Sequence, residues 1–232
     1  MMHGLILAGG EGSRLLASGV TVPKALVTIA GRPQVVRMVA ACRRVGCETV
    51  TCAVREDLAG AVSLAIADPS VRIVALRAPT SLHTLEGGLR EVPPGKVLCT
   101  LVDSVMPVAD WDAAHRAAKM MLTGAAAVVA VTPFVDDASP LWADVSADGI
   151  VNMFGRRGAR DLVTGGVYWF DERARAAASD AVESGVQRLR GFLAQLIELD
   201  LPVRAVEVPK IVDVDTSADL DAALALVEGE QA

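Results

Sequence analysis

The chain has 232 residues, which suits one large domain or two small ones, and its apolar content of 52% with few aromatic residues indicates a core of Ala, Val and Leu. Its net charge of −6 argues against binding to duplex nucleic acid, because proteins of that class present a basic face. The first residues lack the basic segment of a signal peptide, and the apolar run 124–135 is too short to span a membrane.

The cysteines indicate no metal site and no redox pair. Cys42, Cys47, Cys52 and Cys99 form no C-x-x-C pair, so we expect reduced, buried thiols in a cytoplasmic protein.

Short apolar runs alternate with helical patterns through the first 131 residues. Strands are predicted at 4–8, 48–54, 71–76, 96–102 and 125–131. Helices are predicted near 33–45, 56–67, 81–91 and 111–122. This alternation predicts an α/β fold, a mostly parallel sheet with helices on both faces.

The rhythm changes after residue 132. The stretch 141–155 predicts an antiparallel hairpin that turns at Asp148 and Gly149, and a further strand is expected at 162–170. Helices near 172–184 and 187–199, a strand at 203–208, and a loop that opens a last helix within 211–227 complete the pattern. No linker, repeat or low-complexity stretch interrupts the chain, so we expect one domain over 1–232.

A glycine-rich loop follows the first strand, in the sequence "LILAGGEGSRL" (5–15). Ligands of open parallel sheets bind at the carboxyl ends of the strands, and glycines let backbone N–H groups approach an anion. Arg14 adds a charge that can hold phosphate oxygens. The loop matches neither the ATPase P-loop nor the dinucleotide fingerprint, because no lysine follows Gly12 and Leu15 stands at the third glycine position.

The segments around this loop carry a resemblance to a known family. "VPKALVTIAGRP" (22–33) follows the loop, "TLVDSVMP" (100–107) ends a strand with an aspartate, and "VDVDTSADL" (212–220) lies near the end of the chain. In this order and spacing they resemble the sugar-phosphate nucleotidyltransferases. The resemblance implies a Rossmann-like nucleotidyltransferase fold with a small antiparallel region on the substrate side.

The resemblance also implies an activity, the transfer of a nucleotidyl group from a nucleoside triphosphate to a sugar 1-phosphate with release of pyrophosphate. It implies that Mg²⁺ is bound by Asp103 and Asp213, with Asp215 as the reserve ligand. Arg14 and Lys24 would act on the phosphates as catalytic groups. The residues implied to hold the nucleotide through the glycine loop are Leu7, Ala8, Gly9, Gly10, Gly12 and Ser13.

Both specificity regions depart from the family pattern. The segment 78–89 lacks the usual glutamine, which leaves Thr80, Ser81, His83 and Thr84 to contact the nucleotide. The segment 149–159 lacks the usual Glu-Lys-Pro and leaves Arg156 for the substrate, while Gly165 and Gly166 are expected beside the sugar.

Two other functions therefore stay open. One is a cytidylyl- or guanylyltransferase for another phosphorylated small molecule, such as an inositol phosphate, a phospho-alcohol or a pterin phosphate. The other is a silent, nucleotide-binding regulatory subunit, which the paired carboxylates argue against. The sequence leaves the base, the acceptor and a homo-oligomeric state undetermined.

Overall fold

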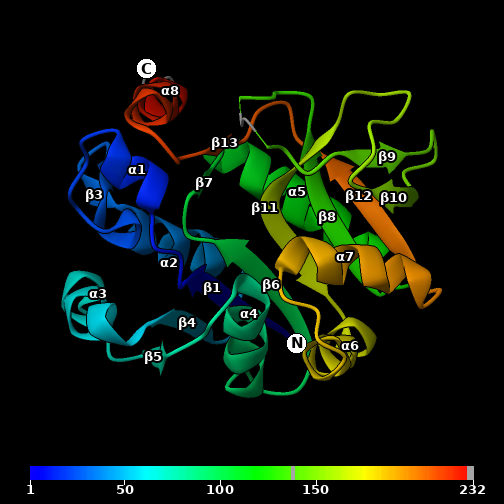
Figure 1. The fold of residues 1–232 in the computed structure, drawn as a ribbon, viewed down its shortest axis with the longest axis horizontal. Coiled ribbons are helices and arrows are strands. Elements are labelled where there is room, and N and C mark those ends of the chain that lie inside the picture. The colour runs from blue at the N-terminus through cyan, green and yellow to red at the C-terminus, as the bar shows by residue number, and fades with distance from the viewer. Residues whose placement is uncertain (137–138, 229–232) are drawn as a thin grey trace.

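A seven-stranded sheet forms the centre of the molecule (Figure 1). The computed structural model describes residues 1–136 and 139–228. Six strands share one direction, and β11 runs antiparallel to both of its neighbours, β6 and β8. The order across the sheet is β12 (Val203–Glu207), β8 (Ala127–Thr132), β11 (Val163–Phe170), β6 (Lys96–Leu101), β1 (Met2–Ala8), β4 (Val50–Arg55) and β5 (Val71–Leu76).

Helices cover both faces of this sheet. One buried cluster joins the sheet to α4 (Ser81–Arg90), α6 (Glu172–Glu183) and α7 (Leu189–Glu198). The opposite cluster joins it to α2 (Gln34–Arg44), α3 (Ala59–Ile66) and α5 (Val108–Met121). The predicted α/β fold with a mostly parallel sheet is confirmed.

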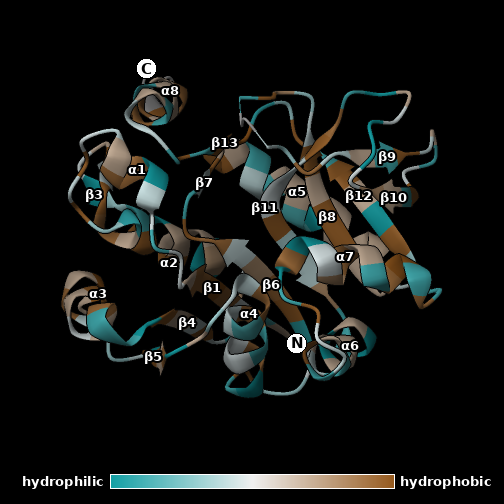
Figure 2. Cartoon of the chain, in the orientation of Figure 1, coloured by the Kyte–Doolittle hydropathy of each residue, from teal (hydrophilic) through white to brown (hydrophobic). Residues whose placement is uncertain are grey.

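The central strands are apolar, as their largely brown colour in Figure 2 shows, and they are buried between the two layers of helices. In β1, Leu5 and Leu7 belong to the first cluster, whereas Ile6 and Ala8 belong to the second. Successive side chains of a strand point to opposite faces, so a strand with helices on both sides needs a continuous apolar run. This explains why the run in the sequence shows no polar alternation.

Several short helices and two-stranded pairs lie outside the central sheet. A third buried cluster includes residues of α1 (Ser13–Ala17) and α8 (Ser217–Glu228). The two-stranded pairs are β2 (Thr28–Ile29) with β3 (Arg32–Pro33), β7 (Ser104–Val105) with β13 (Val212–Asp213), and β9 (Ala143–Val145) with β10 (Val151–Phe154). The last pair is the predicted antiparallel hairpin, and its turn contains Gly149 at φ 81°.

Three expectations need adjustment. The helix expected near 56–67 is divided into a 3₁₀ turn, η2 (Glu56–Leu58), and α3, whereas the helix expected near 111–122 already begins at Val108. The loop expected before the last helix contains β13, which pairs antiparallel with β7 across about half of the chain. Such long-range pairing of two-residue strands has no local sequence signal.

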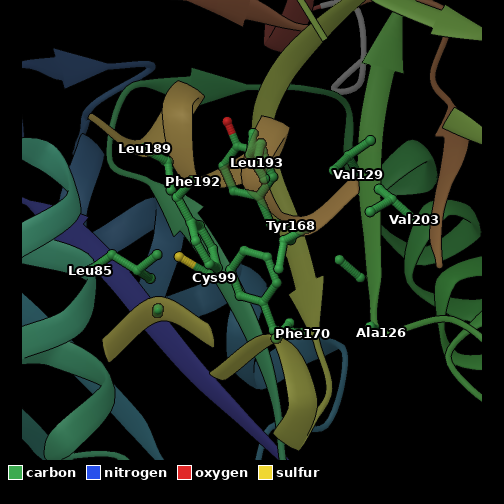
Figure 3. Packing of buried hydrophobic residues seen from close by; sticks show 14 of the residues in the cluster. Leu85, Cys99, Ala126, Val129, Tyr168, Phe170, Leu189, Phe192, Leu193 and Val203 are labelled. Atoms are coloured by element: carbon green, nitrogen blue, oxygen red, sulfur yellow. The ribbon is translucent and has the colours of Figure 1, made fainter. Parts of the chain in front are cut away.

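Helix α7 is anchored in the core by aromatic packing (Figure 3). Phe192 of α7 meets Phe170 of β11 edge to face with ring centroids 5.9 Å apart, and Tyr168 stacks on Phe170 at the same distance. Leu189 and Leu193 of the same helix are also buried in this cluster. Among the residues described, no helix combines the length and apolar character that crossing a membrane requires.

Candidate active site

A cleft of about 570 Å³ opens at the carboxyl ends of the central strands. It brings together residues that are distant in the sequence, as expected for a ligand site of an open parallel sheet. The predicted site residues that line it are Leu7, Ala8, Gly9, Gly10, Gly12, Ser13, Arg14, Lys24, Thr80, Ser81, Thr84, Asp103, Gly165, Gly166, Asp213 and Asp215.

The glycine loop is shaped by close approaches that larger residues would prevent. A Cβ atom on Gly9 would lie 2.8 Å from Oγ1 of Thr84, so this part of the loop packs directly on α4. Gly12 adopts a left-handed φ of 65° immediately before α1 and lies against the side chain of Lys24. The loop therefore contacts both α4, through Gly9, and the side chain of Lys24, through Gly12.

Lys24 lies between two carboxylates at the start of η1 (Lys24–Leu26). Its ammonium group forms ion pairs with Oδ2 of Asp103 and, at 2.5 Å, with Oδ1 of Asp215, and its side chain is only 11% exposed. Burial by itself would lower the pKa of Lys24, but the carboxylates of Asp103 and Asp215 raise it above its ordinary value. The lysine is therefore a fixed positive charge in the cleft.

Asp215 holds both predicted catalytic cations. Its Oδ1 accepts a hydrogen bond from Lys24 and its Oδ2 lies 2.7 Å from the guanidinium of Arg14. The sequence assigned Asp215 as the reserve metal ligand. In the structure both of its oxygen atoms contact cationic side chains, which places Asp215 to orient Arg14 and Lys24, and its assignment as a metal ligand stays a prediction.

A capping box fixes the backbone next to Asp215. Oδ2 of Asp219 accepts hydrogen bonds from the backbone N–H groups of Asp215 and Thr216, at 3.0 and 2.7 Å. Oγ1 of Thr216 in turn accepts from the N–H of Asp219 at 3.4 Å. The cap at the start of α8 therefore also positions a carboxylate of the cleft.

Asp213 reaches the cleft through the short β7–β13 pair. Asp213 lies opposite Ser104 in this pair, and the Ser104 hydroxyl donates to Oδ1 of Asp213 at 3.2 Å. The N–H of Val214 donates to the carbonyl oxygen of Asp103 at 3.2 Å, which ties the two carboxylate-bearing segments together. Burial, followed by the neighbouring Asp103 carboxylate, raises the pKa of Asp213 to about 8, although Lys24 acts in the opposite direction.

Asp103 and Asp213 have the chemistry that a magnesium ion requires. Oδ1 of Asp103 is buried and has no hydrogen-bond partner among the described residues. Mg²⁺ prefers oxygen ligands and is commonly held by one or two carboxylates together with water and substrate phosphates. Within residues 1–136 and 139–228, no three His, Cys, Asp or Glu side chains form a ready metal cage. These two aspartates therefore fit an ion whose remaining ligands come from substrates and water.

Gly165 and Gly166 allow neighbouring segments of the same chain to pack closely against β11. A Cβ on Gly165 would overlap the side chain of Ile211, and a Cβ on Gly166 would overlap the hydroxyl of Ser104. Gly166 also adopts φ 71°, a left-handed conformation that favours glycine. These glycines let β11 approach Ser104 and, through it, Asp213.

Two predicted site residues do not line the cleft. Nδ1 of His83 lies 2.7 Å from Oγ1 of Thr80, whose side chain caps α4, so this histidine belongs to the helix start. Arg156 is exposed on the segment that follows β10. The structure therefore offers no contact between either side chain and the cleft.

Several lining residues were not predicted from the sequence. Arg188 and Arg190 come from the start of α7, Phe134 from the end of β8, and Arg55 from the end of β4. The pattern Arg-Leu-Arg at 188–190, an apolar residue between two cations, was the available sequence signal. It indicates a cationic face only when the position of α7 is known.

Comparison with solved structures identifies the fold. A glucose-1-phosphate thymidylyltransferase from Bacillus anthracis superposes with a TM-score of 0.84 at 16% identity, over 97% of this chain and 95% of that one. The inositol-1-phosphate CTP transferase from T. maritima gives a TM-score of 0.79 at 15% identity, over 98% and 96% of the two chains. A UDP-glucose pyrophosphorylase in complex with UDP-glucose gives 0.77 at 13% identity, over 100% of both chains.

Sequence comparison identifies the family. At the identities above, the structural likeness shows a shared nucleotidyltransferase fold alone, and no curated protein matches the chain in sequence. The profile of the MobA-like NTP transferase domain, however, matches residues 4–195. This match covers most of the sequence and contains the glycine loop, Lys24 and Asp103, so the chain belongs to the family of MobA-like NTP transferase domains.

Proposed function

We propose that this protein transfers a nucleotidyl group from a nucleoside triphosphate to a sugar 1-phosphate, which gives an NDP-sugar and pyrophosphate. The observation that carries the proposal is the cluster in which Lys24 lies between Asp103 and Asp215, next to Arg14 and the glycine loop. A module that only binds nucleotides has no need for buried, paired carboxylates at this position.

The reaction joins two anions. An oxygen of the acceptor phosphate attacks the α-phosphorus of the triphosphate, a new P–O bond forms, and the bond from the α-phosphorus to the bridging oxygen breaks. Pyrophosphate leaves with that oxygen and its electron pair. The work of the protein is to neutralise charge and to hold the attacking and leaving oxygens in line.

The residues of the cleft divide this work between them. Backbone N–H groups of the glycine loop, from Gly9 to Arg14, are the donors for the triphosphate. Arg14, which is half exposed at the rim, is placed to follow the leaving pyrophosphate. Lys24, the buried cation, is placed where charge develops between the α-phosphate and the acceptor phosphate.

Asp103 and Asp213 would hold a magnesium ion. A bound Mg²⁺ supplies positive charge to phosphate oxygens and fixes their orientation. Two observations support this assignment. Oδ1 of Asp103 is buried without a hydrogen-bond partner among the described residues, and the Asp103 carboxylate is near enough to Asp213 to raise its pKa. Asp215 would keep Arg14 and Lys24 in position while the substrates bind.

A second acceptor class is supported by specific observations. Thr164 to Gly166 line the cleft beside Tyr168, but Arg156 does not reach it, and the Glu-Lys-Pro of sugar-handling relatives is missing from 149–159. One structural neighbour is named as an inositol-1-phosphate CTP transferase. A cytidylyl- or guanylyltransferase for another phosphorylated small molecule is therefore the alternative within the same chemistry.

The test is a substrate array that measures pyrophosphate release. ATP, CTP, GTP, TTP and UTP are each combined with glucose 1-phosphate, other sugar 1-phosphates and inositol 1-phosphate, with and without Mg²⁺. We expect release from one or two triphosphates with one acceptor class, and none in the absence of Mg²⁺. Binding of a triphosphate without release for any acceptor would contradict the proposal and favour a regulatory subunit.

A further inference from the structure

The start of α7 presents two arginines to the cleft. Arg188 immediately precedes the helix and Arg190 is its second residue, and both line the 570 Å³ cleft. Leu189 between them is only 5% exposed and belongs to the core. Both arginines therefore line the cleft, whereas the leucine between them packs into the core.

The backbone that carries these arginines is firmly positioned. The N–H of Leu189 donates to Oγ of Ser81 at 3.1 Å, which fixes the start of α7 against the start of α4. Leu189 and Phe192 are buried among the side chains that Figure 3 displays. The guanidinium of Arg190 also donates to the carbonyl oxygen of Ser139 at 3.4 Å, across the rim of the cleft.

Arg188 and Arg190 form no ion pair with a carboxylate within residues 1–136 and 139–228. Most other arginines of the described chain form one: Arg14, Arg43, Arg55, Arg72, Arg77, Arg90, Arg157, Arg160 and Arg173. The cleft lining also contains acidic side chains, but none of the ion pairs of the described residues joins one of them to Arg188 or Arg190, so both guanidinium groups are available to an anionic ligand. The acidic residues are Glu11, Asp103, Asp136, Asp213 and Asp215.

The two arginines are separate from the groups assigned to the reacting phosphates. Arg14 and Lys24 lie between β1 and β2, beside the end of β6, and their charges face Asp103 and Asp215. Helix α7 instead packs with β8 and β11 on one face of the sheet. The cleft therefore has two cationic positions that belong to different parts of the fold.

We propose that the acceptor carries a second anionic group, a carboxylate or a second phosphate, in addition to the phosphate that reacts, and that Arg188 and Arg190 bind this group. The planar guanidinium of arginine matches the oxygen atoms of both anions and forms charge-assisted, often bidentate hydrogen bonds with them. This inference rests on the proposed function, because it assigns the acceptor to the α7 side of the cleft.

The test compares acceptors that differ in one group. Glucose 1-phosphate and glucuronic acid 1-phosphate differ only in a hydroxymethyl and a carboxylate, and glucose 1,6-bisphosphate places a phosphate at the same carbon. Their binding is measured by calorimetry in the presence of α,β-methylene analogues of the five triphosphates, which do not release pyrophosphate. The variants are Arg188→Met with Arg190→Met, and the control Arg116→Met, an exposed arginine on α5.

The wild-type protein and the control should bind one or both of the acidic acceptors at least ~10-fold more tightly than glucose 1-phosphate, as expected for hydrogen bonds between charged groups. Which acidic acceptor binds better distinguishes a carboxylate from a phosphate. The double variant should bind all three acceptors about equally, with unchanged affinity for the triphosphate analogues.

Three results would overturn the inference. They are equal or absent binding of the acidic acceptors by the wild-type protein, a preference that survives in the double variant, and a loss of triphosphate affinity in that variant. The last result would assign the arginines to the nucleotide. The proposed function is judged separately by pyrophosphate release, so turnover of a neutral acceptor with no charge preference would leave it standing.

Discussion

Nζ of Lys24 lies 2.5 Å from Oδ1 of Asp215, although the two residues are 191 positions apart in the sequence. The other oxygen atom of Asp215 contacts Arg14 at 2.7 Å, so one carboxylate orients two cations that come from the first 24 residues. The cleft is therefore assembled only when the end of the chain reaches its beginning. This relationship makes the site sensitive to substitutions in α8 as well as in the glycine loop.

Replacing Lys24 with Met should lower turnover by about 10²–10³-fold, by analogy with the loss of one charge-stabilising donor. The affinity for the nucleotide should change only a few-fold, because the lysine acts where charge develops in the transition state. Steady-state kinetics and nucleotide titration measure the two effects. Lys119→Met, on the exposed side of α5, is the control, and near wild-type turnover of Lys24→Met would remove Lys24 from the mechanism.

The single variants Asp103→Asn and Asp213→Asn should each lose most turnover. Each should also bind Mn²⁺, a spectroscopic substitute for Mg²⁺, more weakly than the wild-type protein. Asn keeps the shape of the side chain but removes the charge that the ion requires. The double variant should be little worse than either single variant, because both substitutions disable the same ion. Additive losses in the double variant, or Mn²⁺ binding as tight as in the control Asp180→Asn, would refute the shared site.

Replacing Gly166 with Ala should reduce both stability and turnover. The new Cβ would overlap the Ser104 hydroxyl, which holds Asp213, and alanine would also adopt the strained φ of 71°. Gly46→Ala is the matched control, because Gly46 has φ 82° with no atom within 4 Å of the added carbon. It should cost only the left-handed strain, about 1–2 kcal/mol of unfolding free energy, and leave turnover unchanged. Equal effects of the two substitutions, measured by urea unfolding and kinetics, would argue against the role of the close approach.

Replacing Asp219 with Ala should destabilise the protein by about 1 kcal/mol and also lower turnover. It removes the acceptor of the backbone N–H groups of Asp215 and Thr216, so the carboxylate that orients Lys24 loses its support. Asp171→Ala removes the cap of α6, far from the cleft lining, and should cost similar stability without affecting turnover. If both variants lose activity in proportion to stability, Asp219 serves only the helix.

Replacing His115 with Asn should make the protein less sensitive to acid. Burial, followed by the charge of Lys119, lowers the pKa of His115, with Asp112 acting in the opposite direction. Nδ1 of the neutral ring accepts a hydrogen bond from Nε1 of Trp169 at 3.2 Å, and protonation at this atom would remove that bond. The unfolded chain binds a proton on His115 near pH 6.5, while the folded protein does so only at lower pH.

The stability of the wild-type protein should therefore fall, through this histidine, as the pH decreases below about 6.5. His115→Asn keeps an acceptor for Trp169 but does not titrate, so its urea midpoint should change less between pH 7.5 and 5.5. If the urea midpoint falls by the same amount between pH 7.5 and 5.5 in the variant and in the wild type, groups other than His115 cause the acid sensitivity.

Local sequence patterns were sufficient for the fold class. The apolar runs, Pro33 before α2 and Gly46 after it, and the turn at Gly149 each act over a few residues, and the corresponding elements lie near the predicted positions. The glycine loop was also identifiable from its short spacing, whereas Lys24 was assigned through the resemblance of the segment 22–33 to a known family. The fold class and the loop depend on backbone conformation and periodicity, which a single sequence records directly.

The arrangement of the site was decided by the tertiary structure. The β7–β13 pair brings Asp213 to Asp103, and the fold also places Asp215 in contact with Arg14 and Lys24. The cleft also receives Arg188 and Arg190 from α7, whereas Arg156 lies outside its lining. A sequence determines which residues favour a helix or a strand, but contacts between distant segments follow from how the buried faces pack, and this packing sets which charges meet.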